Sequence, residues 1–417
     1  MRKNAFFKEY SSEVSVIKCD DIVKMRDFNS INRYKAVKRA VKTLLENLGG
    51  LNVMIPEDAK MVLIKPNLVV ATPPALHLTT DPHITASIAE LLLEHGVKRV
   101  VVAEYPALIH KGRDVFETTL TRKFAEMAGA EIAYLDECEL IDVEVEGAEV
   151  QHSMKIPKIV MDADAIIDVP KMKTHWLTKV TLGIKNLLGL LPLEDKIRFH
   201  REDVHQKLVD IFMLFKDKIA LTLIDGMVAM EGLGPRCGEL VPMGVLIASK
   251  DTVAADAVAS YMMGFDPMEI EEIRIAQDRG LGNGILSKIN YKGPSLNMLK
   301  RSFKRPSLDL VHVYKNVQVY IGGACIACKG FVKATLEALA REGTLKDNLT
   351  ILLGKNPPVP RKLGDKVIVI GDCAKNSIKI RNSYVIEGCP PFMIYWKLPE
   401  ILGVPVPLVL SGSHKTL

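Results

Sequence analysis

At 417 residues the chain is too long for one ordinary hydrophobic core, so we expect two or more domains. Apolar residues make up 48% and charged residues 25% of the sequence, which is an ordinary globular balance. The net charge of +5, from 55 basic and 50 acidic residues, is too small to indicate nucleic-acid binding, and no basic run is interleaved with aromatic residues.

The N-terminal sequence is charged but has no apolar stretch of signal-peptide length. No later segment approaches the ~18 uninterrupted apolar residues of a membrane-spanning helix. We therefore expect a cytoplasmic protein without a membrane partner. Seven cysteines, an odd number, argue against a disulfide framework in a reducing compartment and favour metal or redox use.

The first clear elements are a strand, a helix and a second strand. Residues 59–70 are predicted to form a buried strand that ends at a Lys-Pro-Asn corner, and residues 97–106 the next strand. The helix between them should cover 79–96, with Thr80 as its N-cap and Pro82 in its first turn. Such a unit favours a parallel sheet with helices on its faces.

The same alternation continues along the chain. Later strands are predicted at 163–170, 218–226, 243–249, 317–323, 349–354 and 366–373, and helices at 251–264 and 327–342. Residues 286–312 are basic, contain Pro and Gly and lack a clear period, which indicates a boundary. We predict an α/β fold: a mostly parallel sheet with helices on both faces (1–290), a linker (291–312) and a small C-terminal α/β domain that bears cysteines (313–417).

Polar residues follow several of the predicted strands. In open α/β sheets, ligands bind beyond the carboxyl ends of the strands, so these side chains are expected to converge on one cleft. The strand-end residues are Lys65, Asn67, Glu104, Lys171, Lys173, Asp225 and Glu231. Each of them taken alone is also compatible with an ordinary polar turn.

The segment 168–192 contains four lysines and, after Asp168, no carboxylate. Its apolar residues have helical spacing, although Gly183 and Gly189 weaken a helix. One interpretation is an amphipathic helix with solvated lysines. The other is an anion site, where a desolvated lysine can act as a base or nucleophile. His200 and His205 are five residues apart, so a metal pair on one helical face is weakly supported.

Two nucleotide-binding signatures are missing. Gly232 and Gly234 have no third glycine in register, and there is no P-loop, so nothing indicates a nucleotide cofactor. A flexible loop that presents Glu231 over the cleft is the simpler interpretation of this glycine-rich stretch.

Four cysteines provide the sharpest signal, because they gather in the last 93 residues of the chain next to turn-forming residues: Cys325, Cys328, Cys373 and Cys389. Four thiolates can hold a 4Fe-4S or 2Fe-2S cluster or one tetrahedral zinc ion. The C-x2-C pair before a helix is also typical of a redox-active dithiol. We favour an iron-sulfur cluster, 4Fe-4S in particular, with zinc as the alternative. Cys19, Cys138 and Cys237 are expected to be ordinary core residues.

Seven motifs between residues 60 and 285 occur in the order found in a known family: VLIKPNLV, TTDP, ADAIIDVPKMKTH, TLGIKNLLGLLP, LIDGMVAMEGLGP, ASKDTVAADAVA and MGFDP. The chain thereby resembles the domain-of-unknown-function 362 family. The resemblance implies a cytoplasmic, iron-sulfur-associated protein of anaerobic or archaeal-type metabolism. The ferredoxin-like cysteine run common in that family does not occur here, which leaves the cluster type open.

Three functions remain after these steps. The first is an enzyme that performs redox or proton-transfer chemistry on a small anionic substrate, with a redox protein as a further partner. The second is an electron carrier or cluster-delivery module that docks an acidic protein. The third is a zinc-stabilised, lysine-dependent racemase or lyase. The apolar contexts of Lys65, Lys171 and Lys185 favour the enzyme.

The predicted roles are distributed as follows. Catalytic residues are expected to be Lys171, Lys173, His175, Lys185, Asp225 and Glu231. Substrate-binding residues are expected to be Lys65, Asn67, Thr80, Asp81, Asn186, Lys196 and His200. Replacing Lys171 or Lys185 by Met should preserve the fold and abolish anion binding.

Overall fold

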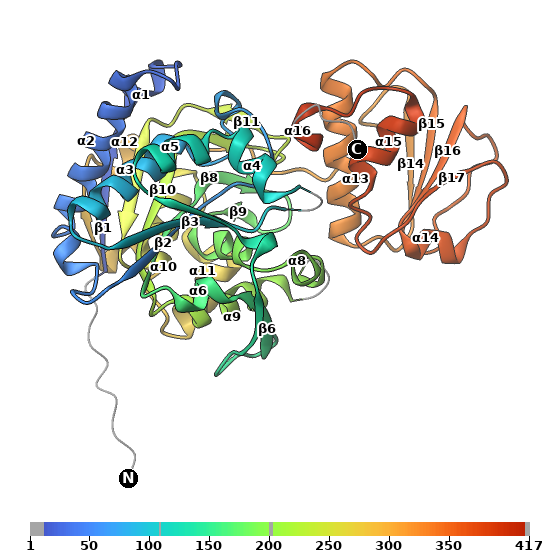
Figure 1. Cartoon of the computed structure of the whole chain (residues 1–417). Helices are drawn as coiled ribbons and strands as arrows, with labels where there is room; N and C mark the ends of the chain where they lie inside the picture. The colour runs from blue at the N-terminus through green and yellow to red at the C-terminus, as the bar shows by residue number, and fades with distance from the viewer. Residues whose placement is uncertain (1–11, 108–109, 200–202, 413–417) are drawn as a thin grey trace, which may run out of the picture.

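A computed structural model of the chain describes residues 12–107, 110–199 and 203–412 (Figure 1). A large mixed sheet with helices on both faces forms the main unit. A four-stranded parallel sheet with its own helices, here called the C-terminal unit (residues 314–412), lies beside it (Figure 1). The α/β fold class is therefore confirmed.

The main sheet has the strand order β13-β1-β12-β10-β7-β2-β3-β4. Strands β8 and β11 also pair with β10, and β9 pairs with β8. The five strands from β10 to β4 run parallel, whereas β12 is antiparallel to both of its neighbours. A separate hairpin is formed by β5 and β6. The bounds are β1 (Ser12–Lys18), β2 (Met61–Pro66), β3 (Arg99–Glu104), β4 (Glu131–Tyr134), β5 (Leu140–Glu144), β6 (Ser153–Pro157), β7 (Ala165–Val169), β8 (Lys171–His175), β9 (Lys179–Thr181), β10 (Ile219–Glu231), β11 (Glu239–Val241), β12 (Val245–Ser249) and β13 (Ile289–Lys292).

Both faces of the sheet are buried beneath helices. Successive side chains of a strand point to opposite sides, so each strand contributes to the apolar clusters of both faces. In β2, Leu63 joins one apolar cluster, whereas Val62 and Ile64 join another on the opposite face. One face carries α2 (Ile31–Asn47), α3 (Pro82–Glu94), α4 (Gly112–Thr118) and α5 (Thr121–Met127). The other carries α7 (Gly183–Asn186), α9 (Val204–Phe215), α10 (Thr252–Met262) and α11 (Glu271–Asp278).

Shorter helices complete the main unit. They are α1 (Asp20–Lys24), α6 (Lys158–Asp162), α8 (Leu193–Phe199) and α12 (Leu296–Leu299), with 3-10 turns η1 (Leu51–Val53), η2 (Pro74–Leu76), η3 (Leu135–Glu137), η4 (Leu187–Leu190), η5 (Pro267–Glu269) and η6 (Leu286–Lys288). The predicted N-cap of α3 was wrong by one residue. Asp81 is the cap, and its carboxylate accepts a hydrogen bond from His83 N at 3.0 Å.

The segment 168–192 does not form the amphipathic helix that its spacing predicts. It forms β8, β9, α7 and η4 instead. Gly183 and Gly189 explain the difference, because each lies against neighbouring side chains. A Cβ at Gly189 would stand 2.1 Å from Glu104 Oε1, and one at Gly183 would stand 2.7 Å from Thr252 Cγ2. Close tertiary contact therefore overrides the helical pattern here.

Two other expectations need correction. The segment that leads to Glu231 is strand rather than flexible loop, because β10 continues to that residue. The segment predicted to begin the linker is partly built into the main sheet, since β13 pairs with β1. In the described part of the chain, no helix combines the length and apolar composition needed to cross a lipid bilayer.

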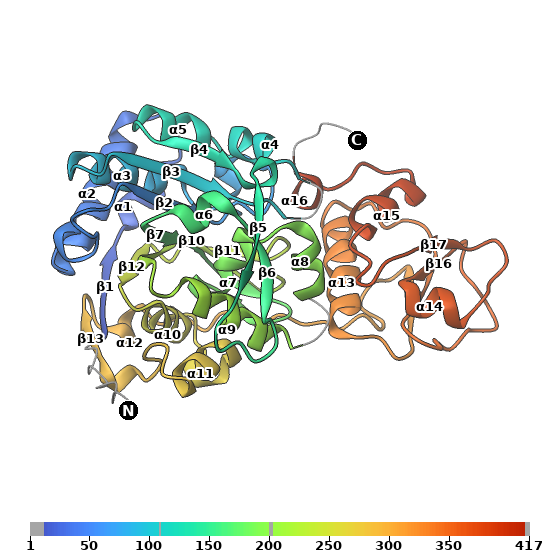
Figure 2. The same ribbon diagram turned by 60° about the horizontal axis from the view of Figure 1, so that its bottom comes forward.

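The C-terminal unit contains four parallel strands in the order β14-β15-β16-β17. Its elements are β14 (Val317–Ile321), α13 (Ile326–Arg341), β15 (Leu349–Leu353), β16 (Lys366–Ile370), α14 (Asp372–Ser377), β17 (Tyr384–Ile386), α15 (Ile394–Leu402) and α16 (Leu408–Ser411). Helix α13 lies on the side that faces the main unit (Figures 1 and 2). There Trp176 of the main unit packs on Phe331, with ring centroids 5.7 Å apart.

Candidate functional site

A pocket of about 150 Å³ lies between the carboxyl ends of the main-sheet strands and the C-terminal unit. Its volume has room for about ten water molecules, so it suits a ligand with about as many non-hydrogen atoms. The main unit contributes Lys65, Asn67, Glu104, His175, Lys185, Asn186, Lys196 and Arg236. The C-terminal unit contributes Phe331, Pro390, Phe392 and Tyr395.

One ion pair lies at the base of this pocket. Lys65 Nζ donates to Glu104 Oε2 at 2.6 Å and to Pro66 O at 2.8 Å. The two residues end adjacent parallel strands, β2 and β3, which brings them to the same edge of the sheet. Burial raises the pKa of Glu104, although Lys65 and Lys196 oppose the shift.

A chain of amides connects the pocket with the sheet interior. Lys173 Nζ donates to Asn67 Oδ1 at 2.7 Å, and Asn67 Nδ2 donates to Asn186 Oδ1 at 3.1 Å. Asn186 Nδ2 in turn donates to Asp168 Oδ1 at 2.8 Å. Asp168 Oδ2 is buried without a hydrogen-bond partner among the described residues, and burial raises the pKa of this carboxyl to about 7. The chain thus ends on a carboxyl group that can take up a proton near neutral pH.

Two lysines of the pocket have pKa values close to neutrality. Burial lowers the pKa of Lys185 to about 8, against the attraction of Glu272. Burial lowers the pKa of Lys196 to about 7, against the attraction of Glu104. Lys196 Nζ also donates to Tyr105 O, and to Pro106 O at 3.1 Å. Both amines can therefore exchange a proton near physiological pH.

Arg236 brings a buried positive charge to the same pocket. The residue is 5% exposed. Its guanidinium donates to two carbonyl oxygens, Leu410 O at 3.0 Å and Val69 O at 2.8 Å, and contacts His110 Nε2 at 3.5 Å. Burial and Arg236 together lower the pKa of His110 to about 3, which keeps this imidazole neutral. In the described chain, no carboxylate pairs with Arg236, and its guanidinium donates to carbonyl oxygens instead.

His175 completes the wall that faces the C-terminal unit. Its ring stacks on Trp176 with centroids 5.3 Å apart, and its Nδ1 accepts a hydrogen bond from Leu177 N at 3.0 Å. The Nδ1 acceptor assigns the proton of the neutral ring to Nε2.

A second group of charged residues lies apart from the pocket, and we call it the paired cluster: Arg33, Asp81, Lys171 and Asp225. Lys171 Nζ lies 2.8 Å from Asp225 Oδ2. The two terminal guanidinium nitrogens of Arg33 donate to the two oxygens of the Asp81 carboxylate. Asp81 N donates to Asp225 Oδ2 at 2.9 Å, which joins the two pairs. Arg33, Asp81 and Lys171 line a different cavity, together with His77.

The predicted lysine cleft is therefore only partly assembled. Lys65, Asn67, His175, Lys185, Asn186 and Lys196 line the pocket. Lys173 and Thr80 adjoin it by hydrogen bonds to Asn67.

The remaining predicted residues lie elsewhere. Lys171, Asp81 and Asp225 belong to the paired cluster. Glu231 lines a third cavity, where its carboxylate accepts a hydrogen bond from Lys304 N at 3.0 Å. The placement of Lys171, Asp225 and Glu231 in the cleft was wrong, because adjacent chain positions at a bulged strand end reach different cavities. His200 lies outside the described residues.

Sequence analysis missed Arg236 and Asp168. Arg236 follows the turn Gly234-Pro235, and a basic residue after a glycine-rich loop that follows a strand could have indicated it. Asp168 was noted only as the start of the lysine-rich segment. Its position inside a buried strand end was the available signal, because an ionised carboxyl is costly there.

The four cysteines lie at one edge of the C-terminal sheet, since each follows a parallel strand. Cys325 caps α13 and Cys328 lies in its first turn, whereas Cys373 is the second residue of α14 and Cys389 follows β17. The pKa of Cys325 is lowered to about 5 by hydrogen bonds from the Cys328 thiol and from backbone amides. The pKa of Cys328 is raised, first by its hydrogen bond to Cys325 and then by burial and by the charges of Cys325, Cys389 and Cys373.

The surroundings of the four cysteines are open. Cys325, Cys373 and Cys389 are exposed, and Gly371, with φ of +87°, leaves space beside Cys328, where an added Cβ would stand 3.6 Å from Sγ. In the described chain, no group of three or more His, Cys, Asp or Glu side chains is arranged so that it could hold a metal ion. Cysteine thiolates are ligands both of zinc and of iron-sulfur clusters.

Comparisons with known proteins give three kinds of match. A family model described as a domain of unknown function, DUF362, matches residues 62–261. A thylakoid-associated protein from Synechocystis is 32% identical over 257 residues, which cover 58% of this chain and 74% of that protein.

Two solved structures are more distant. A Thermotoga maritima protein is 16% identical with a TM-score of 0.29, over 47% of this chain and 50% of that one. The lactate racemase apoprotein from Thermoanaerobacterium thermosaccharolyticum is 14% identical with a TM-score of 0.33, over 57% of this chain and 53% of that one. The chain thus spans about half the length of these two structures.

Proposed function

Because the chain belongs to the DUF362 family, which its description leaves without a reaction, we propose a function from the geometry of its pocket. The protein is an enzyme that binds a small anionic metabolite between its two units and transfers protons or electrons there. The four C-terminal cysteines hold an iron-sulfur cluster next to that site.

The excess of positive charge in the pocket carries this proposal. Lys65, Lys185 and Arg236 line it, and Lys65 pairs with the carboxylate of Glu104, which leaves Lys185 and Arg236 without a carboxylate partner among the described residues. Buried charges are normally paired, so a buried pocket with surplus cations favours an anionic ligand. Arg236 is the strongest candidate for the anion contact, because its planar fork matches a carboxylate or phosphate.

The chemistry follows from the proton-exchanging groups around that anion. The neutral form of Lys185 or Lys196 can accept a proton from a carbon next to the anionic group, and the Nε2 proton of His175 can be donated. Asn67 and Asn186 orient Lys173 and Asp168 behind them. The apolar rings of Phe331, Phe392 and Tyr395 exclude water from one side of the pocket.

The position of the cysteines supports a link between the two sites. Pro390 lines the pocket and directly follows Cys389. Phe331 lines the pocket from α13, three residues after Cys328. An iron-sulfur cluster bound there would supply one-electron transfer or Lewis acidity to the adjacent pocket.

Anaerobic purification followed by iron, sulfide and zinc analysis tests the cluster. The parent protein should be brown and contain iron and acid-labile sulfide, and Cys389→Ser should lose most of both. Cys138→Ser is the matched control, because Cys138 lies in the main unit and its thiol donates to Tyr134 O at 3.3 Å. Colourless parent protein with stoichiometric zinc would instead support the zinc-stabilised racemase or lyase.

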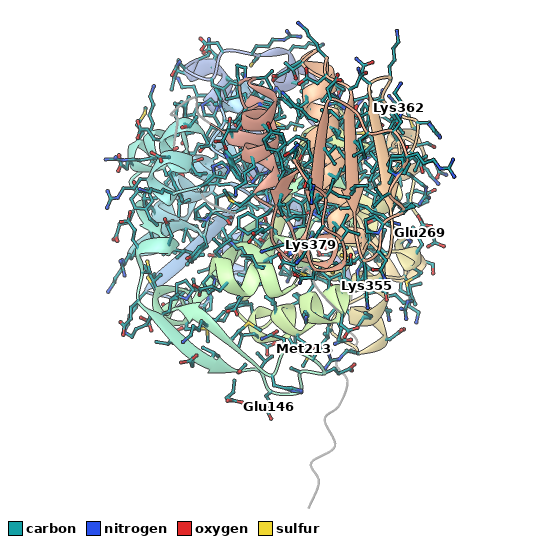
Figure 3. The ribbon with its side chains drawn as sticks, turned by 90° about the vertical axis from the view of Figure 1, so that its right-hand side faces the viewer. Glu146, Met213, Glu269, Lys355, Lys362 and Lys379 are labelled. Carbon is teal, nitrogen blue, oxygen red and sulfur yellow. The ribbon has the colours of Figure 1, made fainter. Side chains whose placement is uncertain are left out.

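Surface charge favours one second candidate, an electron carrier that docks an acidic protein. Figure 3 looks onto the C-terminal unit and shows Lys355 and Lys379 on its lower side, with Lys362 at its upper end. Lys355 bridges to Gly323, two residues before Cys325, and Lys379 follows α14, which carries Cys373. If the parent protein reduces an acidic ferredoxin but binds no small carboxylate or phosphate in calorimetry, the carrier is the better description.

A further inference from the structure

Lys185 differs from the other lysines near the pocket in its contacts. It is 6% exposed, and it makes no hydrogen bond or ion pair within the described part of the chain. Lys65 pairs with Glu104, and Lys173 donates to Asn67 and Leu78 O. A buried lysine without a partner is rare, because an ammonium ion loses its hydration there without compensation.

The surroundings of Lys185 favour its neutral amine. Burial is the main cause of its lowered pKa, about 8, and the opposing charge of Glu272 comes from α11. A neutral amine that faces a pocket is a nucleophile towards carbonyl carbon. The other ionisable and charged groups that line the same pocket are Lys65, Glu104, Tyr105, His175, Lys196, Arg236 and Tyr395.

We propose that Lys185 forms a Schiff base with a small oxo acid whose carboxylate is bound by Arg236. This inference rests on the proposed function and names the substrate class of its pocket. Lys185 and Arg236 line the same pocket, which has room for about ten non-hydrogen atoms. An oxo acid of this size supplies both groups that the pocket matches, an anion for Arg236 and an electrophilic carbon for Lys185.

The step balances without a further reagent. The Lys185 nitrogen attacks the carbonyl carbon and forms a carbon-nitrogen bond. The two hydrogens of the amine leave with the carbonyl oxygen as water, and a carbon-nitrogen double bond replaces the carbon-oxygen double bond. Protonation of the imine nitrogen withdraws electrons from the imine carbon, which makes a hydrogen on the adjoining carbon more acidic. Lys196, which lines the same pocket, accepts that proton in its neutral form.

Borohydride trapping tests the Schiff base on the full-length protein as purified. Pyruvate and 2-oxoglutarate serve as carbonyl probes, and lactate serves as the matched acid without a carbonyl group. Intact mass and peptide mapping should locate a reduced pyruvate or 2-oxoglutarate adduct on Lys185 and no adduct with lactate. Labelling should rise about tenfold from about pH 7 to about pH 9, because the free amine fraction rises over this range.

Variants separate this lysine from unspecific labelling. Lys185→Met and Lys185→Arg should give no adduct. Lys179→Met should label as the parent does, because Lys179 is an exposed lysine nearby that donates to Glu269 O at 2.7 Å. An adduct on any other lysine would overturn the inference.

Calorimetry with the same three acids at low salt separates two kinds of failure. If pyruvate or 2-oxoglutarate binds the parent protein and neither is trapped, the Schiff base is wrong while the anion pocket stands. If none of the three acids binds and none is trapped, both the Schiff base and the proposed carboxylate site are wrong.

Discussion

The paired cluster and the pocket contain similar side chains but compensate their charges differently. In the paired cluster, Lys171 has Asp225 as its partner and Arg33 has Asp81. In the pocket, Lys185 and Arg236 have no carboxylate partner within the described chain. Basic residues near strand ends can thus serve two purposes. A compensated charge belongs to the fold, whereas an uncompensated one is the kind of charge that the proposed function assigns to ligand binding.

The acidic groups show the same difference. Burial raises the pKa of Asp81, but the guanidinium of Arg33 outweighs it, so the net shift is downward and the group is ionised. Burial raises the pKa of Asp168 to about 7, and burial also raises the pKa of Glu104 above its usual value. Asp168 and Glu104 therefore lie closer to protonation than Asp81 of the paired cluster.

The largest effect is expected when the paired cluster is broken. Asp225→Ala should lower the free energy of unfolding by about 3 to 5 kcal/mol, because Lys171 would remain buried without a carboxylate. Lys171→Met should also destabilise the fold, because it leaves the Asp225 carboxylate without its ion-pair partner. The sequence alone had predicted that this variant preserves the fold. Urea unfolding measures both changes.

Two further variants check that result. The double variant Lys171→Met with Asp225→Leu should regain much of the lost stability, since two apolar side chains can replace a buried pair. Glu137→Ala, which breaks the exposed pair with Arg113, should leave the unfolding curve unchanged. If Asp225→Ala unfolds at the same urea concentration as the parent, the ion pairs of the paired cluster do not stabilise the fold, and this difference from the pocket is wrong.

The next effect, about 4 kcal/mol, is expected from the pH dependence of Asp168. Its folded pKa, about 7, lies above the usual value of 3.8, so the folded state binds more protons between these pH values. Stability from this group should therefore fall by about 1.4 kcal/mol per pH unit as pH rises through this range. Asp168→Asn should remove this decline, as measured by unfolding between about pH 4 and pH 8.

The control for Asp168 is Asp164, in the turn before the same strand. Its pKa is lowered by hydrogen bonds from Met61 N and Lys60 N. Asp164→Asn should leave the decline between about pH 5 and pH 7 intact, because a group with a lowered pKa stays ionised there. An equal effect of both variants would show that the decline does not arise from Asp168.

The smallest effect concerns ligand affinity. Arg236→Met should weaken the binding of a small carboxylate about tenfold to a hundredfold, the range of one hydrogen bond to a charged group. Arg236→Lys should retain part of the affinity, because it keeps the charge but loses the fork. Calorimetry at low salt measures both, with Arg113→Met as the surface control. Unchanged affinity in Arg236→Met would remove the anion role of this residue.

The sequence was informative about elements and about residues at strand ends. The apolar runs of β2, β3 and β7 predict strands correctly, because buried parallel strands require apolar side chains on both faces. Lys65 and Asn67 were predicted as site residues because they follow a strand, and both line the pocket. The carboxyl ends of parallel strands share one edge of the sheet, which brings such residues together. The turn-flanked cysteines likewise gather at one edge of the C-terminal sheet.

Helical spacing between residues 177 and 191 was misleading. Periodicity reports which side chains are apolar, but it does not report how closely a neighbouring segment approaches the backbone. The approach of Glu104 to Gly189 and of Thr252 to Gly183 decides that segment, and it involves residues far away in the chain.

The sequence by itself determined the α/β alternation, the basic residues at the strand ends and the four cysteines near turns, because these depend on local composition and order. Only the tertiary structure decided which of those charges are compensated. Asp225 is 54 residues from Lys171, and Leu410 O is 174 residues from Arg236. Such distant partners decide whether a buried cation stabilises the fold or remains free for a ligand, since desolvation is offset only by groups in direct contact.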